Sequence, residues 1–86
     1  MPTVHRERGY RFHFFSDERQ EPPHVHVQQG DGAAKVWLAN GSFAYSVGFN
    51  AAQLRVVREI VAVNRERILR AWHEHHEQAS GSSDDG

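Results

Sequence analysis

Two turn-forming dipeptides, Asp31-Gly32 and Asn40-Gly41, separate segments in which apolar and polar residues alternate. Such dipeptides are favoured in two-residue β-hairpin turns of type I′, because both central residues of those turns need positive φ. The dipeptides therefore predict two consecutive hairpins, and they also predict which residues lie opposite each other. Counting outward from the first turn places His26 opposite Trp37.

The registers predicted from the two turns agree, and together they divide three strands into two faces. Counting from the second turn pairs Val36 with Tyr45 and Leu38 with Phe43. Because strand side chains alternate, a slip of one residue would exchange the two faces. The predicted apolar face carries Val25, Val27, Val36, Leu38, Phe43, Tyr45 and Val47. The opposite face, which we call the open face, carries His24, His26, Lys35, Trp37, Ala44 and Ser46.

Residues 3–8 and 10–15 alternate in the same way and predict two further strands, joined at Arg8-Gly9. Residues 16–23 form a polar loop between these strands and the histidine strand. The loop ends in Pro22-Pro23, which fixes an extended entry into His24. The sequence therefore predicts about five strands in all.

A helix is predicted after the last strand. Asn50 and Gln53 have capping-box spacing, and Phe49 can pack against Leu54 as a hydrophobic staple. Apolar residues then recur at three- and four-residue steps, which predicts one helix with a single apolar face. That face carries Leu54, Val57, Ile60, Val61, Ile68 and Trp72.

The predicted fold class is therefore α+β, an antiparallel β-meander of about five strands with one long C-terminal helix packed on one face. We expect residues 1–78 to form one domain and residues 79–86 to form a disordered tail rich in Ser, Gly and Asp. One helix covers only one face of an antiparallel sheet, so the open face is left for water, a partner or a second copy.

Composition limits the classes of function. The chain has 86 residues, no cysteine and a formal net charge of −1. Its pI of about 6.6 gives no basic footprint for nucleic acid, so that partner is only weakly supported. No segment reads as a secretion signal or a membrane span, and we expect a cytoplasmic protein without a membrane partner. The sequence also lacks a glycine-rich phosphate loop, a Ser/His/Asp arrangement and a helical zinc-protease motif.

His24 and His26 are the main candidates for chemistry. Residues two apart on a strand point to the same face, so the two imidazoles would stand side by side. Two imidazoles can ligate Zn, Cu, Ni or Fe, and histidine also transfers protons near neutral pH. Zinc normally needs three or four protein ligands. A third ligand could be His13, if its strand lies beside the histidine strand, or one of the loop residues Asp17, Glu18 and Glu21.

Two other interpretations compete with chemistry at this pair. In a structural role, His24 would bond carbonyl groups of the loop and His26 would stack on Trp37. In a binding role, Trp37 with Lys35 and the two histidines would form an interface anchor, because Trp is enriched at binding hot spots.

A second group of histidines lies near the end of the predicted helix. His73 and His76 have the i, i+3 spacing that allows chelation from one helical face. The alternative is that a histidine-rich last turn complements the negative end of the helix dipole.

Six segments carry a family resemblance: Met1-Pro2-Thr3-Val4, Gly9-Tyr10-Arg11-Phe12, Pro22-Pro23-His24-Val25-His26-Val27, Ala34-Lys35-Val36-Trp37-Leu38, Gly48-Phe49 and Ala71-Trp72. Over residues 1–73 the chain resembles the small bacterial family called domain of unknown function 4160. The resemblance implies no established activity. It implies a gene often found beside another small domain, domain of unknown function 2442, in arrangements like toxin–antitoxin pairs. His73 and His76 depart from the family pattern, which has Asn and an aromatic residue there.

These observations favour a small binding module rather than an enzyme. We expect it to bind a small protein partner, or a second copy, through His24, His26, Lys35 and Trp37, and to need no cofactor. The alternative is a metal-dependent enzyme, such as a toxin-like nuclease, in which His24 and His26 are ligands of a divalent metal or an acid/base pair.

Overall fold

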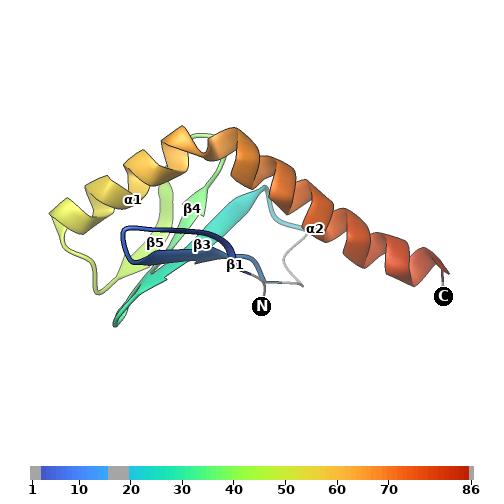
Figure 1. Ribbon diagram of the computed structural model, residues 1–86, viewed down its shortest axis with the longest axis horizontal. Helices are drawn as coiled ribbons and strands as arrows, with labels where there is room; N and C mark the ends of the chain where they lie inside the picture. Colours follow the sequence, from blue (N-terminus) through green and yellow to red (C-terminus); the bar gives the residue numbers. More distant parts are fainter. Residues whose placement is uncertain (1–2, 16–19, 86) are drawn as a thin grey trace.

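The computed structural model describes residues 3–15 and 20–85, and side chains as far as residue 76. Five strands are followed by two helices (Figure 1). The strands are β1 (Thr3–Glu7), β2 (Tyr10–His13), β3 (His24–Gln29), β4 (Gly32–Trp37) and β5 (Phe43–Val47). The helices are α1 (Ala51–Val63) and α2 (Arg65–Asp85). This arrangement confirms the predicted α+β class.

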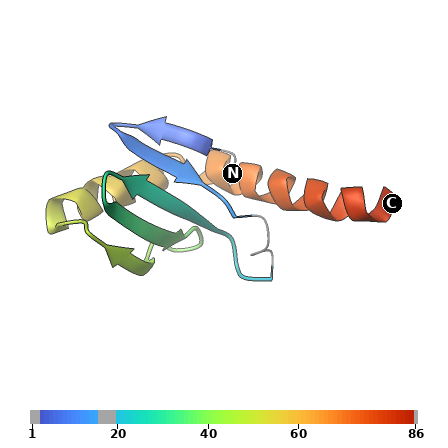
Figure 2. The same ribbon diagram turned by 90° about the horizontal axis from the view of Figure 1, so that it is seen from below.

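The five strands form one antiparallel sheet in the order β1-β2-β3-β4-β5, which confirms the predicted meander. β3 therefore lies in the middle of the sheet, and β1 and β5 are its edges. Figure 2 shows the sheet from the side opposite the helices, with the first hairpin at one edge and β5 at the other. The sequence could not place the first hairpin, and the structure places β2 directly beside the histidine strand.

The register of β3 and β4 differs from the predicted one by two residues. His24 lies opposite Trp37 and His26 opposite Lys35, so the predicted pairing of His26 with Trp37 is wrong. Gly32 already belongs to β4, and Gly30, at φ 55°, supplies the positive φ of the turn. A glycine at the first central position is typical of type II′ hairpins. Because the shift is an even number of residues, the faces of β3 and β4 are as predicted.

The register of β4 and β5 changes the face of three residues. Lys35 pairs with Tyr45 and Val36 with Phe43, so Ala44 is an extra residue at a β-bulge. Tyr45 and Val47 consequently lie on the open face and not on the apolar face, whereas Ser46, predicted on the open face, lies opposite Ala34 on the side of the helices. The prediction failed here because the second connection is longer than a two-residue turn.

Hydrogen bonds explain why this second connection is longer. The amide of Trp37 donates to the carbonyl of Ser42, and the amide of Gly41 donates to the carbonyl of Trp37. The Asn40 side chain also accepts bonds from the amide and hydroxyl of Ser42. Asn40-Gly41 therefore belongs to a wider connection whose register is set by the bulge.

The hydrophobic core lies between the sheet and the helices. Val25, Val27, Val36 and Leu38 are buried there as predicted, while Phe43 is only partly buried and Tyr45 and Val47 are exposed. The rest of the buried apolar set comes from β2 and the residue after it, from β4 and from the helices: Tyr10, Phe12, Phe14, Ala34, Val57, Ile60, Val61, Ile68 and Trp72.

The helix begins at the predicted capping box, in which Asn50 accepts from the Gln53 amide and the Gln53 side chain accepts from the Asn50 amide. The prediction of one long helix is wrong, because it breaks at Asn64 (Figure 1). The Asn64 side chain donates to the carbonyl of Ile60 over 2.8 Å, as a polar side chain that competes with the helix backbone does. Arg65 then donates to the carbonyl of Leu38, which holds the bend against the end of β4.

α2 extends beyond the sheet toward the C-terminus (Figure 1). Side chains are described only as far as residue 76. The disordered tail that we expect over residues 79–86 stays a prediction. None of the described helices is long and apolar enough to cross a lipid bilayer.

Candidate functional site: a buried histidine layer beside an exposed strand

Three histidine side chains lie together on the face of the sheet opposite the helices. His13 of β2 lies opposite His26 of β3, and their rings stack with centroids 5.7 Å apart and 22° between planes. The ring of His24 lies 5.2 Å from that of His26, nearly at right angles to it. We call these three residues the histidine layer. β2 thus lies beside β3, as the proposal of His13 as a third ligand requires, and the ligand role itself stays a prediction.

The histidine layer is buried, although the sequence predicted that this face would be open. His13, His24 and His26 are only 5%, 2% and 5% exposed. Phe15, just beyond β2, covers His26 with its ring centroid at 4.3 Å and nearly perpendicular. Since a carbonyl oxygen can only accept, Nδ1–H of His24 donates the 2.9 Å bond to Pro22. The expected bond from His24 to a loop carbonyl is therefore present.

Lys35 and Trp37 form a polar and aromatic rim beside the histidine layer. The Trp37 ring meets the His24 ring edge-on, with centroids 5.7 Å apart. The ammonium of Lys35 lies 4.8 Å from the Trp37 ring centroid and forms an ion pair with Glu21. A cation over an indole face is an attractive arrangement. Lys35 is therefore held in place on two sides and is not a free surface charge.

The accessible part of this face is formed by Tyr45 and Val47 of β5, which the sequence analysis assigned to the apolar face. Tyr45 is 46% exposed and Val47 is 63% exposed. The hydroxyl of Tyr45 lies 3.5 Å from Nδ1 of His26, so the strand borders the histidine layer. The exposure of these two residues could have been predicted only if the bulge at Ala44 had been known, because the turn dipeptides placed them on the opposite face.

A cavity of about 170 Å³ opens between the histidine layer and β5. Its lining includes His13, Phe15, His26, Ala33 and Tyr45. The small Ala33 side chain leaves this space between the larger rings.

The electrostatic state of His13 follows from its burial. Burial, the nearby Arg11 and His26 together lower the pKa of His13 from 6.5 to about 4. Its Nδ1 atom is buried without a hydrogen-bond partner among the described residues. His13 is therefore an uncharged ring at neutral pH, and it cannot supply a proton as an imidazolium there.

The site lies within the part of the chain that matches a known family. Residues 9–73 match the family described as Domain of unknown function (DUF4160). The chain belongs to this family. The match includes the histidine layer, Trp37 and all of β5, and it confirms the resemblance seen in the sequence. No curated protein and no solved structure matches the chain.

The described residues of this DUF4160 domain contain no group of three or more histidine and carboxylate side chains suited to hold a metal ion. Glu21, one of the predicted third ligands, lies 3.9 Å from Nδ1 of His24, but it is engaged with Lys35. Asp17 and Glu18 lie outside the described residues. A divalent metal on His24 and His26 stays a prediction.

The helical histidines of the DUF4160 domain do not share one surface. His76 is buried with its ring centroid 4.2 Å from that of Trp72, whereas His73 is exposed. They also lie in the middle of α2, which continues to Asp85. His76 therefore extends the core, and neither chelation with His73 nor compensation of the helix dipole explains it.

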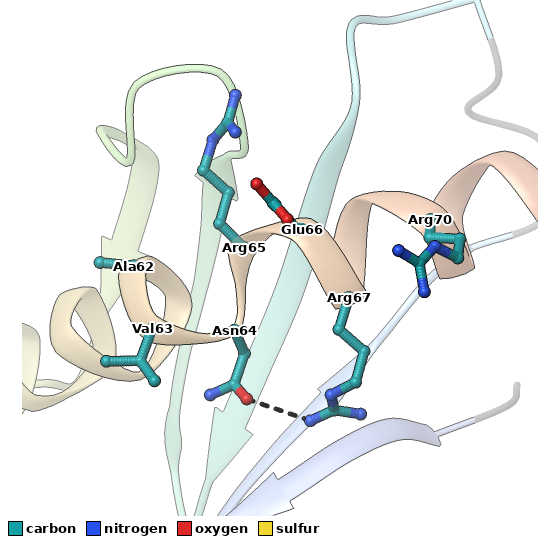
Figure 3. A pocket seen from close by; sticks show the side chains of 7 residues that line it. All are labelled: Ala62, Val63, Asn64, Arg65, Glu66, Arg67 and Arg70. Carbon is teal, nitrogen blue, oxygen red and sulfur yellow. Dashed lines mark hydrogen bonds between the residues drawn. The ribbon is translucent and has the colours of Figure 1, made fainter.

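An arginine-lined depression of about 530 Å³ lies where α1 and α2 meet (Figure 3). Arg65 and Arg67 point to opposite sides of the helix bend there, and the three arginines do not meet at one point. Arg65 is bonded to the carbonyl of Leu38, and Arg67 is bonded to Asn64. The depression of the DUF4160 domain thus has no converging set of cationic groups for an anion.

Proposed function

We propose that this DUF4160 domain is a protein-binding module that receives a small partner on the binding strip formed by Trp37, Tyr45 and Val47. One observation carries the proposal: two large apolar side chains are exposed next to each other along β5, on the face of the sheet that also carries a half-buried tryptophan. Isolated exposed apolar residues are normal on a protein surface, but neighbouring ones beside an aromatic anchor are typical of interfaces.

The histidine layer borders this strip on the same face of the sheet. Its three rings pack against Phe15, Trp37 and Tyr45, with centroids between 4.3 and 6.5 Å apart. Such packing limits the rotamers of the exposed aromatic residues, and a pre-organised surface loses less entropy on binding. The roles of His24 and His26 are thus to position Trp37 and Tyr45 and not to touch the partner themselves.

The partner that we propose is the small protein expected from a neighbouring gene, as in toxin–antitoxin-like pairs. The formal net charge of −1 suits a contact made mainly by aromatic and apolar groups. It favours nucleic acid less, because nucleic-acid binding depends strongly on basic side chains.

Replacing both exposed residues of the strip tests the proposal. The Tyr45→Ser, Val47→Ser double variant should bind the purified neighbouring gene product at least about tenfold more weakly, because hot-spot residues each contribute more than about 1 kcal/mol. Isothermal titration calorimetry measures the affinity. Val63→Ser is the matched control, since Val63 is 84% exposed on α1, away from the strip. Equal binding by the double variant and the wild type would contradict the proposal.

A second candidate function is acid–base catalysis, for instance by a toxin-like nuclease. The observation that favours it is the cavity of about 170 Å³ that His26 and Tyr45 line together. His26 would exchange protons there, and His13 would stay uncharged. This proposal predicts that His26→Gln abolishes RNA cleavage by the purified protein while Tyr45→Ser, Val47→Ser has a smaller effect. Metal content, compared with that of the His24→Ala, His26→Ala variant, separates metal-dependent from metal-free chemistry.

A further inference from the structure

The two edges of the sheet differ in how they are protected. β1 carries His5, Arg6 and Glu7, and its side chains contact α2 through Arg67 and the helix bend through Asn64. β5 reads Phe-Ala-Tyr-Ser-Val and has neither a charge nor a proline. Charged residues and prolines are the usual means by which proteins block pairing at an edge strand. β5 is therefore the edge at which no charge or proline prevents another strand from pairing.

β5 is also accessible along its length. Among the described strands it pairs only with β4, and four of its five residues are exposed. Alternate residues of an edge strand direct their N–H and C=O groups away from the sheet. The bulge at Ala44 leaves Tyr45, Ser46 and Val47 in regular pairing with β4. Figure 2 shows β5 at the edge of the sheet. This short segment can therefore accept a second strand.

We infer that a second copy of this chain occupies this edge, so that β5 pairs antiparallel with β5 of its partner and the two sheets become one. The inference goes beyond the proposed function: the edge of β5 takes a second copy, while the binding strip on the open face takes the neighbouring gene product. A two-fold axis places the same strand opposite itself, which requires a segment without like charges. β5 meets this requirement because it is uncharged throughout.

The helix side of this edge is also self-complementary in charge. A groove of about 640 Å³ runs between the start of β5 and α1, with Phe43 and Leu54 among its apolar residues. Arg55, Arg58 and Glu59 also line it, so both signs of charge are present. A second copy would bring both signs of charge to this groove, so opposite charges are available on each side of such a contact. Charge complementarity therefore favours a second copy over a strongly charged partner.

Sedimentation equilibrium over a range of concentrations tests the inference. The wild type should show a concentration-dependent dimer of modest affinity, because the paired segment is short. Ser46→Lys should be monomeric, since it places like charges opposite each other. Ser46 is exposed and lies opposite the buried Ala34, so the substitution leaves the open face unchanged. Thr3→Lys is the matched control, because it adds the same charge at the exposed start of β1.

The outcomes separate this inference from the proposed function. If the wild-type protein stays monomeric at every concentration, the inference of a dimer is overturned. This holds even if a different protein adds a strand to β5. The binding strip would still stand if Tyr45→Ser, Val47→Ser weakens binding of the neighbouring gene product. A dimer lost in Thr3→Lys but kept in Ser46→Lys would place the contact at β1 and also overturn the inference.

Hydrogen exchange of the wild type provides a test that needs no variant. The amides of residues 44–48 should become more protected as the protein concentration rises, while those of β1 stay unchanged. Unchanged protection of residues 44–48 in a sample that sediments as a dimer would overturn the pairing through β5.

Discussion

At the scale of single residues, the most unusual feature is a layer of three nearly inaccessible imidazoles in a chain with a small core. Buried histidines normally need hydrogen bonds or ring contacts to offset the loss of water. His24 has the bond to Pro22, and His13 and His26 stack on each other. The Pro22-Pro23 entry is thus part of the site, because it fixes the carbonyl that the imidazole needs.

The depressed pKa of His13 predicts how stability depends on pH. Its pKa is about 4 in the folded protein and 6.5 in the unfolded chain. Between these values only the unfolded chain takes up the proton, so the free energy of unfolding falls as pH drops from 6.5 toward 4 and then levels off. The full loss amounts to about 3 kcal/mol at most, by the usual conversion of pKa shifts.

The variant that isolates this effect is His13→Phe, which keeps an aromatic ring where Nδ1 has no partner among the described residues. Urea unfolding at both ends of the pH window should show a smaller acid-induced loss in His13→Phe than in the wild type. Glu7, whose pKa is lowered mainly by its hydrogen bond with His5, titrates in both proteins and cancels from the comparison. Equal acid sensitivity of the two proteins would show that His13 is not the residue responsible.

Sequence patterns predicted the identity of the site residues better than their exposure. The His-Val-His-Val alternation predicted correctly that His24 and His26 share a face and that the valines enter the core. It could not predict burial of the histidines, because Glu21 and Pro22 lie in a loop without periodicity and the sequence could not place the strand that leads to Phe15 beside β3. A polar residue on a strand is read as exposed unless the covering segment is known.

At the scale of secondary-structure elements, local hydrogen bonds decided where the predictions succeeded. The start of α1 was predictable because Asn50 and Gln53 satisfy each other within four residues. The bend at Asn64 was not, because helical periodicity continues through it and the bond that holds it reaches Leu38 of a distant segment. The face of β5 was missed for a similar reason, since the bulge at Ala44 leaves no mark in the turn dipeptides.

The capping box allows a quantitative prediction for α1. Asn50→Ala removes the acceptor for the Gln53 amide and should lower the free energy of unfolding by about 1 kcal/mol. Asn50→Asp is the matched control, because aspartate is an equally good N-cap and should leave stability nearly unchanged. Chemical denaturation followed by circular dichroism measures both. A cost for Asn50→Asp as large as that for Asn50→Ala would mean that the cap is not what stabilises this end.

At the scale of the whole molecule, the two faces of one sheet carry different kinds of packing. Val25 and Val27 contribute to the apolar layer under the helices, while His24 and His26 contribute to the imidazole layer on the other face. The helix bend and the bond from Arg65 to Leu38 connect the helices to the end of β4. Both layers include side chains of the same strand, β3, so we expect the two layers to unfold together.

The two tryptophans test this expectation, because Trp37 lies beside the imidazole layer and Trp72 lies in the apolar core. In Trp72→Phe the fluorescence reports only Trp37, and in Trp37→Phe it reports only Trp72. Each variant should show a fluorescence transition that coincides with its own circular dichroism transition, as in two-state unfolding. A Trp37 transition at lower denaturant than the dichroism change would show that the imidazole layer opens separately.

The alternation in β3 also means that one short strand responds to two different physical variables. The contribution of its valines depends on temperature, since burial of apolar surface changes the heat capacity and weakens on cooling. On its other face the strand contacts His13 of β2, and the contribution of that ring depends on proton concentration, because burial lowers its pKa to about 4. Cold would therefore loosen the chain from the helix side of the sheet, and acid would loosen it from the opposite side.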